Sequence, residues 1–177
     1  MAAREDAFVQ KIAQTFVEQV YDREDIWHIY DEVEHILDII KETHLGRILN
    51  SATVSLEDKE EFLRTLRQSE YRFVNDLVEV VIQNGQAGLL KEILETVLFK
   101  ISKHKNAFDA VVTSVQPLTD EQKERIATLT EKRFDIRVRN VVEHIDREIL
   151  GGFIVNINHH VIDASVRSQL KDIRKKL

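Results

Sequence analysis

Histidine, glycine and carboxylate side chains are the groups of this sequence that could carry out chemistry, and their spacing argues against the usual sites. The seven His include no His-x-x-x-His pair, the spacing that places two imidazoles on one helical face as metal ligands. His159 and His160 fall in a predicted strand turn, where adjacent side chains point apart, so a surface turn is favoured over a metal site. The chain has no Cys, which excludes thiolate metal sites, disulfides and a thiol nucleophile.

Glycine-rich loops and paired carboxylates supply no catalytic motif either. The glycine clusters Gly85–Gly88 and Gly151-Gly152 are not followed by the Lys-Ser or Lys-Thr of a phosphate-binding loop. No Gly-x-Ser-x-Gly nucleophile turn occurs. The 31 Asp and Glu residues are expected to form solvated helix faces, and no spacing pairs two of them as acid and base. The sequence therefore predicts a protein with no catalytic residue, no metal site and no cofactor.

Composition and charge limit the function further. The 177 residues are 43% hydrophobic and 32% charged, with a formal charge of −6. Residues 1–105 carry 13 basic and 20 acidic side chains, whereas residues 106–177 carry 12 and 11. The acidic half would repel phosphodiester backbones, so nucleic acid is not an expected partner. The longest uncharged stretch, Ile149–Ile162, is shorter than the roughly 20 apolar residues of a spanning helix.

The apolar spacing up to about residue 105 is helical. From Ile26 to Ile40 the apolar residues follow the i, i+3, i+4, i+7 rule without a gap. Ser55 with Asp58 is typical of a helix N-cap. The pattern predicts an all-α bundle of five helices, or six with a short turn, over residues 8–21, 26–40, 45–49, 56–66, 73–82 and 86–101.

After residue 105 short alternating runs replace the helical pattern. A first strand is expected from residue 108 to its end at Pro117, and further strands over residues 136–139 and 153–157; the polar pair Asn158-His159 leads into a further run at 161–162. The predicted fold class is α+β. An N-terminal helical bundle (1–105) is followed by a small C-terminal α+β domain (106–177) with a mixed sheet and two helices.

Two helices are expected in the C-terminal domain. A Thr119 and Gln122 capping box starts a helix that runs to about residue 133, with Ile126 and Leu129 inward. Asp163 or Ser165 caps the terminal helix. Its apolar face is expected to pack in this domain's own core and consists of Val166, Leu170, Ile173 and Leu177.

Three features are not explained by a minimal fold: surplus apolar surface on the first helix, an apolar side chain at Trp27, and backbone freedom at Gly151-Gly152. The first helix has two apolar stripes, which suits either a central bundle helix or a groove for a partner's amphipathic helix. Trp27 lies off the core series of its helix, as an exposed interface anchor or as a partly buried packing residue. Gly151-Gly152 permits a positive φ or a close backbone crossing, in a structural turn or a ligand-contacting loop.

The last 70 or so residues show a family resemblance. Residues 108–118 (Phe-Asp-Ala-Val-Val-Thr-Ser-Val-Gln-Pro-Leu) and the following Thr-Asp-Glu-Gln are similar to the start of the C-terminal domain of the delta subunit of bacterial F-type ATP synthases. The run 141–155, with Leu150, Gly151 and Gly152, resembles that family's signature, as do Asp163 and Ser165 before a basic terminal helix. The mitochondrial member of the family is the oligomycin-sensitivity-conferring protein. The N-terminal half resembles the family in length and helix order.

The resemblance implies a non-catalytic stator subunit of a proton- or sodium-translocating synthase. In that family the N-terminal bundle receives N-terminal helices of the alpha subunits, and the C-terminal domain meets the b subunits of the peripheral stalk. The subunit holds the catalytic head against the rotor, and reaches the cytoplasmic side of the bacterial cell membrane through its partners. With Trp27, the expected partner-binding residues are Phe8, Ile12, Phe16, Phe73 and Leu77.

Two other functions are weighed against this one. A carboxylate-dependent hydrolase would need convergent acids with raised pKa values in a pocket. A nucleic-acid adaptor would use the basic residues of the C-terminal half, namely Arg137, Arg139, Arg167, Lys171, Arg174, Lys175 and Lys176. The first has no support in the spacing of the acids, and the second is opposed by the acidic half. The stator role is therefore the leading hypothesis.

Overall fold

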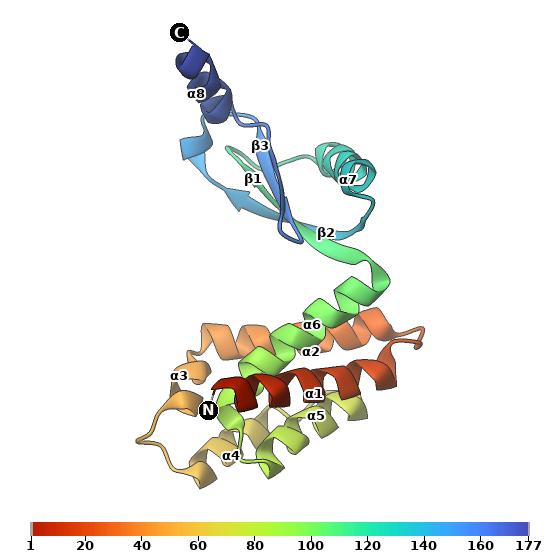
Figure 1. Cartoon of the computed structure of the whole chain (residues 1–177), viewed down its shortest axis with the longest axis vertical. Coiled ribbons are helices and arrows are strands. Elements are labelled where there is room, and N and C mark those ends of the chain that lie inside the picture. The colour runs from red at the N-terminus through yellow and green to blue at the C-terminus, as the bar shows by residue number, and fades with distance from the viewer. Residues whose placement is uncertain (1, 177) are drawn as a thin grey trace. The chain divides into compact units, whose positions relative to one another are not determined.

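The computed structural model describes residues 2–176, which divide into a unit ending at His104 and a unit starting at Lys105 (Figure 1). The first unit is helical, as predicted. Its elements are α1 (Ala2–Val20), α2 (Ile26–Glu42), α3 (Leu45–Asn50), α4 (Leu56–Thr65), α5 (Arg72–Gln83), the 3-10 turn η1 (Ala87–Leu89) and α6 (Leu90–Lys105), whose last residue opens the second unit.

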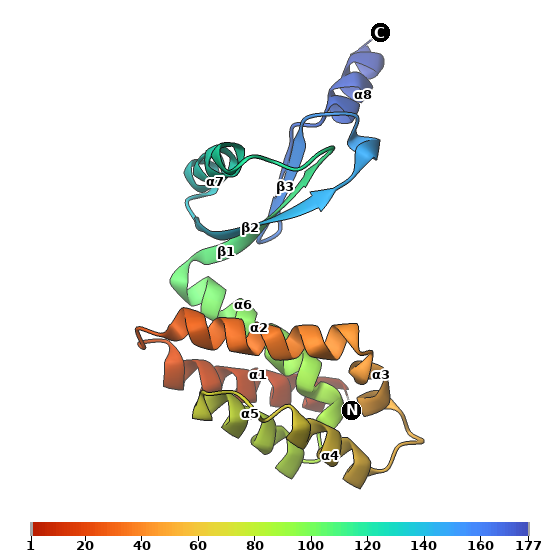
Figure 2. The same cartoon turned by 180° about the vertical axis from the view of Figure 1, so that it is seen from behind.

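The core of the first unit forms where α1, α2, α5 and α6 pack together. Figures 1 and 2 show α1 running alongside α2 and α5. The second apolar stripe of α1, with Val9, Ala13 and Val17, is buried in this core. On the other stripe Phe16 is buried, whereas Phe8 and Ile12 are only partly covered. Helix α1 is thus a central bundle helix that also leaves part of one stripe at the surface.

Local sequence signals define these helices. The apolar series of α2 is buried at every predicted position, from Ile26 to Ile40. At the start of α4 the Ser55 hydroxyl oxygen accepts a hydrogen bond from the Asp58 backbone N–H (3.1 Å), which confirms the predicted cap. This bond pairs one of the backbone donors that a helix N-terminus leaves without an intrahelical partner.

The second unit is a mixed four-stranded sheet with helices. Its elements are β1 (Ala107–Ser114), α7 (Asp120–Phe134), β2 (Arg137–Ile145), the 3-10 turn η2 (Arg147–Ile149), β3 (Phe153–Ile157), β4 (His160–Asp163) and α8 (Val166–Lys176). The strand order is β2-β1-β3-β4. β1 pairs parallel with β2, through the α7 crossover, and antiparallel with β3, which pairs antiparallel with β4.

Capping and strand alternation behave largely as predicted in this unit. Thr119 and Gln122 form a complete capping box at the start of α7. Alternate β1 residues, Phe108, Ala110 and Val112, are buried in the sheet core. The second strand is longer than expected, because β2 continues through Val141 and Val142 to Ile145 in register with β1.

Two predictions of inward-facing residues are wrong. Leu129 is 49% exposed, because α7 buries a narrow strip that contains Ile126 and, one turn later, Thr130. The apolar face of α8 is also exposed, with Val166, Leu170 and Ile173 at 38%, 53% and 57%. The sheet and α7 complete the core without it. Leu177, expected on the same face, lies outside the described residues.

A candidate helix-binding groove between α1 and α5

Helices α1 and α5 enclose a hollow of about 160 Å³ at the surface of the first unit. Phe16 and Leu77 are almost fully buried and form its floor, whereas Ile12 and Phe73 are partly exposed on its two sides. The hollow is lined by Ile12, Thr15, Phe16, Gln19, Phe73, Asp76, Leu77 and Val80. The contributing positions recur every three or four residues on each helix, so one face of α1 and one face of α5 build it.

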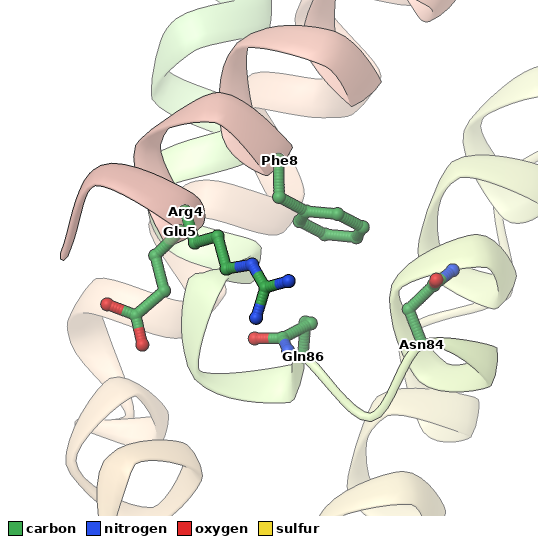
Figure 3. A pocket seen from close by; sticks show the side chains of 5 residues that line it. All are labelled: Arg4, Glu5, Phe8, Asn84 and Gln86. Carbon is green, nitrogen blue, oxygen red and sulfur yellow. The ribbon is translucent and has the colours of Figure 1, made fainter. Parts of the chain in front are cut away.

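A second hollow of about 280 Å³ lies where α1 begins and α5 ends. It is lined by Arg4, Glu5, Phe8, Asn84 and Gln86, and Figure 3 shows the Phe8 ring and the Arg4 guanidinium pointing into it. Residues 8, 12 and 16 follow one another at intervals of four along α1, so the two hollows share one stripe of that helix. We call the surface formed by the two hollows the α1–α5 groove.

The structure brings most of the expected partner-binding residues together in this groove. Ile12, Phe16, Phe73 and Leu77 line the first hollow and Phe8 lines the second. Phe16 and Leu77 are buried rather than outward, so they shape the groove from beneath.

Trp27 lies apart from these residues. It is partly buried against the core of the first unit, with its ring 5.6 Å from that of Tyr30, and it lines neither hollow of the groove.

The polar residues of the groove were not anticipated from the sequence. Asp76 lies three positions after Phe73, so the helical period of α5 could have placed it on the same face. No such signal marks Arg4, which falls in a charged N-terminal segment.

Charged side chains stabilise the Phe73 end of the groove. The Arg23 guanidinium carbon lies 5.1 Å from the centre of the Phe73 ring, within the range of a cation–π contact. Arg23 also forms two hydrogen bonds of 2.8 Å to the Asp25 carboxylate. These bonds lower the pKa of Asp25 and raise that of Arg23. Arg23 is thereby held over the aromatic side chain.

In the second unit the glycine pair forms a corner between η2 and β3 and lies against the segment that leads into α8. A Cβ atom on Gly152 would lie 2.2 Å from the Ala164 carbonyl oxygen, and the residue has a φ of +73°. The Val166 N–H donates to the Gly151 carbonyl (3.0 Å) and the Ala164 N–H to the Phe153 carbonyl (2.9 Å). The position therefore requires glycine for a close backbone crossing, which is a structural role.

The other signature residues fix the start of α8. The Asp163 carboxylate accepts hydrogen bonds from the Ser165 N–H (2.9 Å) and the Ser168 hydroxyl. Hydrogen bonding to the Ser165 side chain, to the Ser168 hydroxyl and to the Ser165 N–H lowers the pKa of Asp163. The Ser165 hydroxyl accepts from the Ser168 N–H (3.2 Å) and so caps the helix. Leu150, by contrast, is exposed, in a left-handed conformation.

A carboxylate on β2 also holds the loop that precedes α7. Glu143 accepts a hydrogen bond from the Leu118 N–H (2.6 Å), and its other oxygen lies 3.0 Å from the Lys123 ammonium. The backbone hydrogen bond and the Lys123 contact lower the pKa of Glu143. This carboxylate is engaged in structural contacts.

Two kinds of site are absent from the described part of the chain. Residues 2–176 contain no group of three or more His, Asp or Glu side chains arranged to hold a metal ion. None of the helices they form is long and apolar enough to cross a membrane.

Comparisons with known proteins agree on one family. The family model described as ATP synthase delta (OSCP) subunit matches residues 9–177. Proteins named ATP synthase subunit delta from Streptococcus equinus and Streptococcus mutans are 37% and 36% identical, over all of this chain and 99% of theirs.

A solved structure shares the fold. A chain in the cryo-EM structure of the Toxoplasma gondii mitochondrial ATP synthase hexamer aligns with a TM-score of 0.65 at 14% identity, over 95% of this chain and 96% of that one. The sequence matches extend through both units of the structure. The chain therefore belongs to the ATP synthase delta (OSCP) subunit family, a non-catalytic component of ATP synthase.

Proposed function

We propose that this subunit is a stator linker that joins the catalytic head of an F-type ATP synthase to its peripheral stalk and resists rotor torque. In this proposal the α1–α5 groove binds an N-terminal helix of an alpha subunit, and the second unit binds the b subunits. The subunit reaches the cytoplasmic side of the cell membrane through these partners, and proton or sodium transport takes place elsewhere in the complex.

The observation that carries the proposal is the apolar lining of the α1–α5 groove. From Arg4 to Gln19 the groove follows α1 for about 22 Å at 1.5 Å per residue, which matches a helix of about four turns. Phe8, Ile12 and Phe73 offer partly exposed apolar surface along it. An amphipathic helix that lays its apolar face into such a groove is a recurrent mode of peptide recognition.

The exposed face of α8 supports binding by the second unit. Val166, Leu170 and Ile173 are spaced four and three residues apart and so lie on one face of the helix. Basic residues flank this face at Arg167, Lys171, Arg174 and Lys175. We propose that the two units act as separate domains, with a boundary near residue 105, each of which grips one neighbour.

A peptide-binding experiment tests the groove. A fluorescent synthetic peptide of the alpha-subunit N-terminal helix should bind the full-length protein, and Ile12→Asp or Phe73→Asp should weaken binding. Loss of a well-packed anchor at a protein interface often costs about 2 kcal/mol, which is roughly 30-fold in affinity. The matched control is Phe62→Asp, because Phe62 is an exposed aromatic residue of α4 that does not line the groove.

The readouts separate binding from folding. Helix content by circular dichroism should be unchanged in all three variants. Equal affinity for wild type and both groove variants, at unchanged helix content, would contradict the proposed site. Co-purification of the tagged chain from membranes without alpha or b subunits would contradict the stator role itself.

A further inference from the structure

The two ends of the α1–α5 groove carry opposite charges. At the end where α1 begins, the Arg4 guanidinium points into the hollow toward Gln86, whereas the Glu5 carboxylate points away from it (Figure 3). Arg4 forms no ion pair with any acidic side chain among residues 2–176. At the other end, Asp76 is the one charged residue that lines the hollow with Phe73. The Arg23 guanidinium over the Phe73 ring is neutralised by its pair with Asp25.

Asp76 is available to a ligand because its ion pair with Arg72 is weak. Its carboxylate lies 3.5 Å from the Arg72 guanidinium, one turn earlier on α5, and both side chains are exposed. Exposed pairs of this kind contribute about 0–1 kcal/mol, since water competes for both charges.

The backbones of α1 and α5 contribute little net electric field along the groove. Phe8 lies beside Asn84, whereas Phe16 and Gln19 lie beside Phe73, so α1 and α5 run antiparallel. Their macrodipoles therefore oppose each other, and side chains set the electrostatic direction. Between the charged ends the stripe of α1 is uncharged at Phe8, Ile12 and Phe16.

We infer that the α1–α5 groove selects the direction of the helix it binds, with the acidic end of that helix against Arg4 and its basic end against Asp76. This inference rests on the proposed function, in which the groove binds an amphipathic helix. A short helix that must form on binding is stabilised by acidic residues in its first turn and basic residues in its last. The matching ligand therefore runs parallel to α1, with its N-terminus at Arg4.

In the opposite direction, the positive N-terminal end of the ligand's macrodipole would face Asp76 and its negative C-terminal end would face Arg4, which is favourable. That dipole amounts to about half an elementary charge at each end, whereas each side chain carries a full charge. Side-chain pairing therefore outweighs the dipole and fixes the direction.

Cross-linking of designed peptides to single-cysteine variants tests the direction. The chain has no Cys, so Ala3→Cys and Gln19→Cys each place one thiol at one end of the groove, on exposed positions of α1. Two 16-residue peptides carry the same apolar stripe, one with an acidic first turn and a basic last turn, the other with these charges exchanged. With a cysteine at its N-terminus, the first peptide should form a disulfide with Ala3→Cys and the second with Gln19→Cys.

A charge exchange in the protein gives a second readout. Each peptide should prefer its expected cysteine over the other one by roughly two- to fivefold for each end that the opposite direction would mispair. The double variant Arg4→Glu with Asp76→Lys should reverse this preference. The control double variant Lys11→Glu with Glu61→Lys makes the same changes on exposed side chains outside the groove and should keep it.

The outcomes separate this inference from the proposed function. If neither peptide nor the alpha-subunit helix binds, the groove is not a helix site. If both peptides bind but cross-link equally at both ends, or keep their preference in the Arg4→Glu, Asp76→Lys variant, the groove binds helices without selecting their direction.

Discussion

Replacing Gly152 by alanine should destabilise the second unit strongly, because two separate costs fall on this one residue. Its φ of +73° is in the left-handed region, which costs a residue with a Cβ roughly 1–2 kcal/mol. The new Cβ would also lie 2.2 Å from the Ala164 carbonyl oxygen, a backbone atom that cannot move alone. Forcing such an overlap to relax costs about 1–3 kcal/mol. We therefore expect a loss of about 2–5 kcal/mol.

Two other glycines provide matched controls for these costs. Gly85 has a φ of +63° with nothing within 4 Å of its added Cβ, so Gly85→Ala should show the backbone cost alone, about 1–2 kcal/mol. Gly46 lies in α3 with an ordinary van der Waals neighbour at 3.7 Å and no positive φ. Gly46→Ala should be neutral or stabilising by up to about 1 kcal/mol, since glycine weakens a helix.

Thermal unfolding followed by two probes is the suitable assay. Trp27 is the only Trp and lies in the first unit, so its fluorescence follows that unit, whereas far-ultraviolet circular dichroism follows both. For a domain of 60–100 residues, 1 kcal/mol shifts the melting temperature by roughly 4–8 °C. Gly152→Ala should lower the second unit's transition by about 10 °C or more and leave the Trp27 transition in place. An unchanged melting curve would refute the close crossing at Gly152.

Three further predictions concern the second unit. Glu143→Gln should destabilise the protein at pH 7 and reduce the loss of stability at low pH. Hydrogen bonding lowers the pKa of Glu143 from its ordinary value of 4.5. The ionised carboxylate therefore stabilises the fold above pH 4.5, and this contribution is lost as the pH falls through the lowered pKa. Urea midpoints from pH 3 to 7 test this, and identical pH profiles would contradict it. Ile173→Ser should change the free energy of unfolding, measured by urea titration, by less than about 0.5 kcal/mol, since the side chain is exposed; a larger loss would place it in a core. Thr119→Ala should cost about 1 kcal/mol through the lost α7 cap, whereas Thr119→Ser should keep it.

The elements themselves were largely predictable because their signals are local. The period of the apolar residues from Ile26 to Ile40 defines the buried face of α2 within a single helix. The Thr119 and Gln122 capping box involves residues only three apart. Such patterns depend on residues that are close together in the sequence, so they can be identified without knowing the tertiary structure.

The groove depends on packing between distant parts of the chain, and there the sequence alone was insufficient. The double stripe of α1 indicated surplus apolar surface, but nothing in its spacing shows that Ile12 lies near Phe73. Family resemblance supplied that pairing as an expectation. Arg4 and Asp76 were missed because charged residues on helices usually face water, and only the fold shows that these two mark the ends of a groove.

Apolar periodicity also fails to show what covers a helix face. Val166, Leu170 and Ile173 form a regular stripe, and the prediction assigned it to the core of the same domain. The sheet and α7 bury enough side chains without it, so the stripe remains at the surface. A helix that packs on its own domain and a helix that binds a partner have the same apolar periodicity.

The central position of β1 has a consequence for how the protein is made. Its two neighbours come later in the chain, since Ala107 pairs with Arg137 and Val111 with Asn156. Such distant pairings are slow to form, whereas the helices of the first unit can begin to fold as soon as they leave the ribosome. Until β3 is synthesised, one side of β1 exposes unpaired backbone groups. We therefore expect nascent chains interrupted before Phe153 to carry a folded bundle and an aggregation-prone strand.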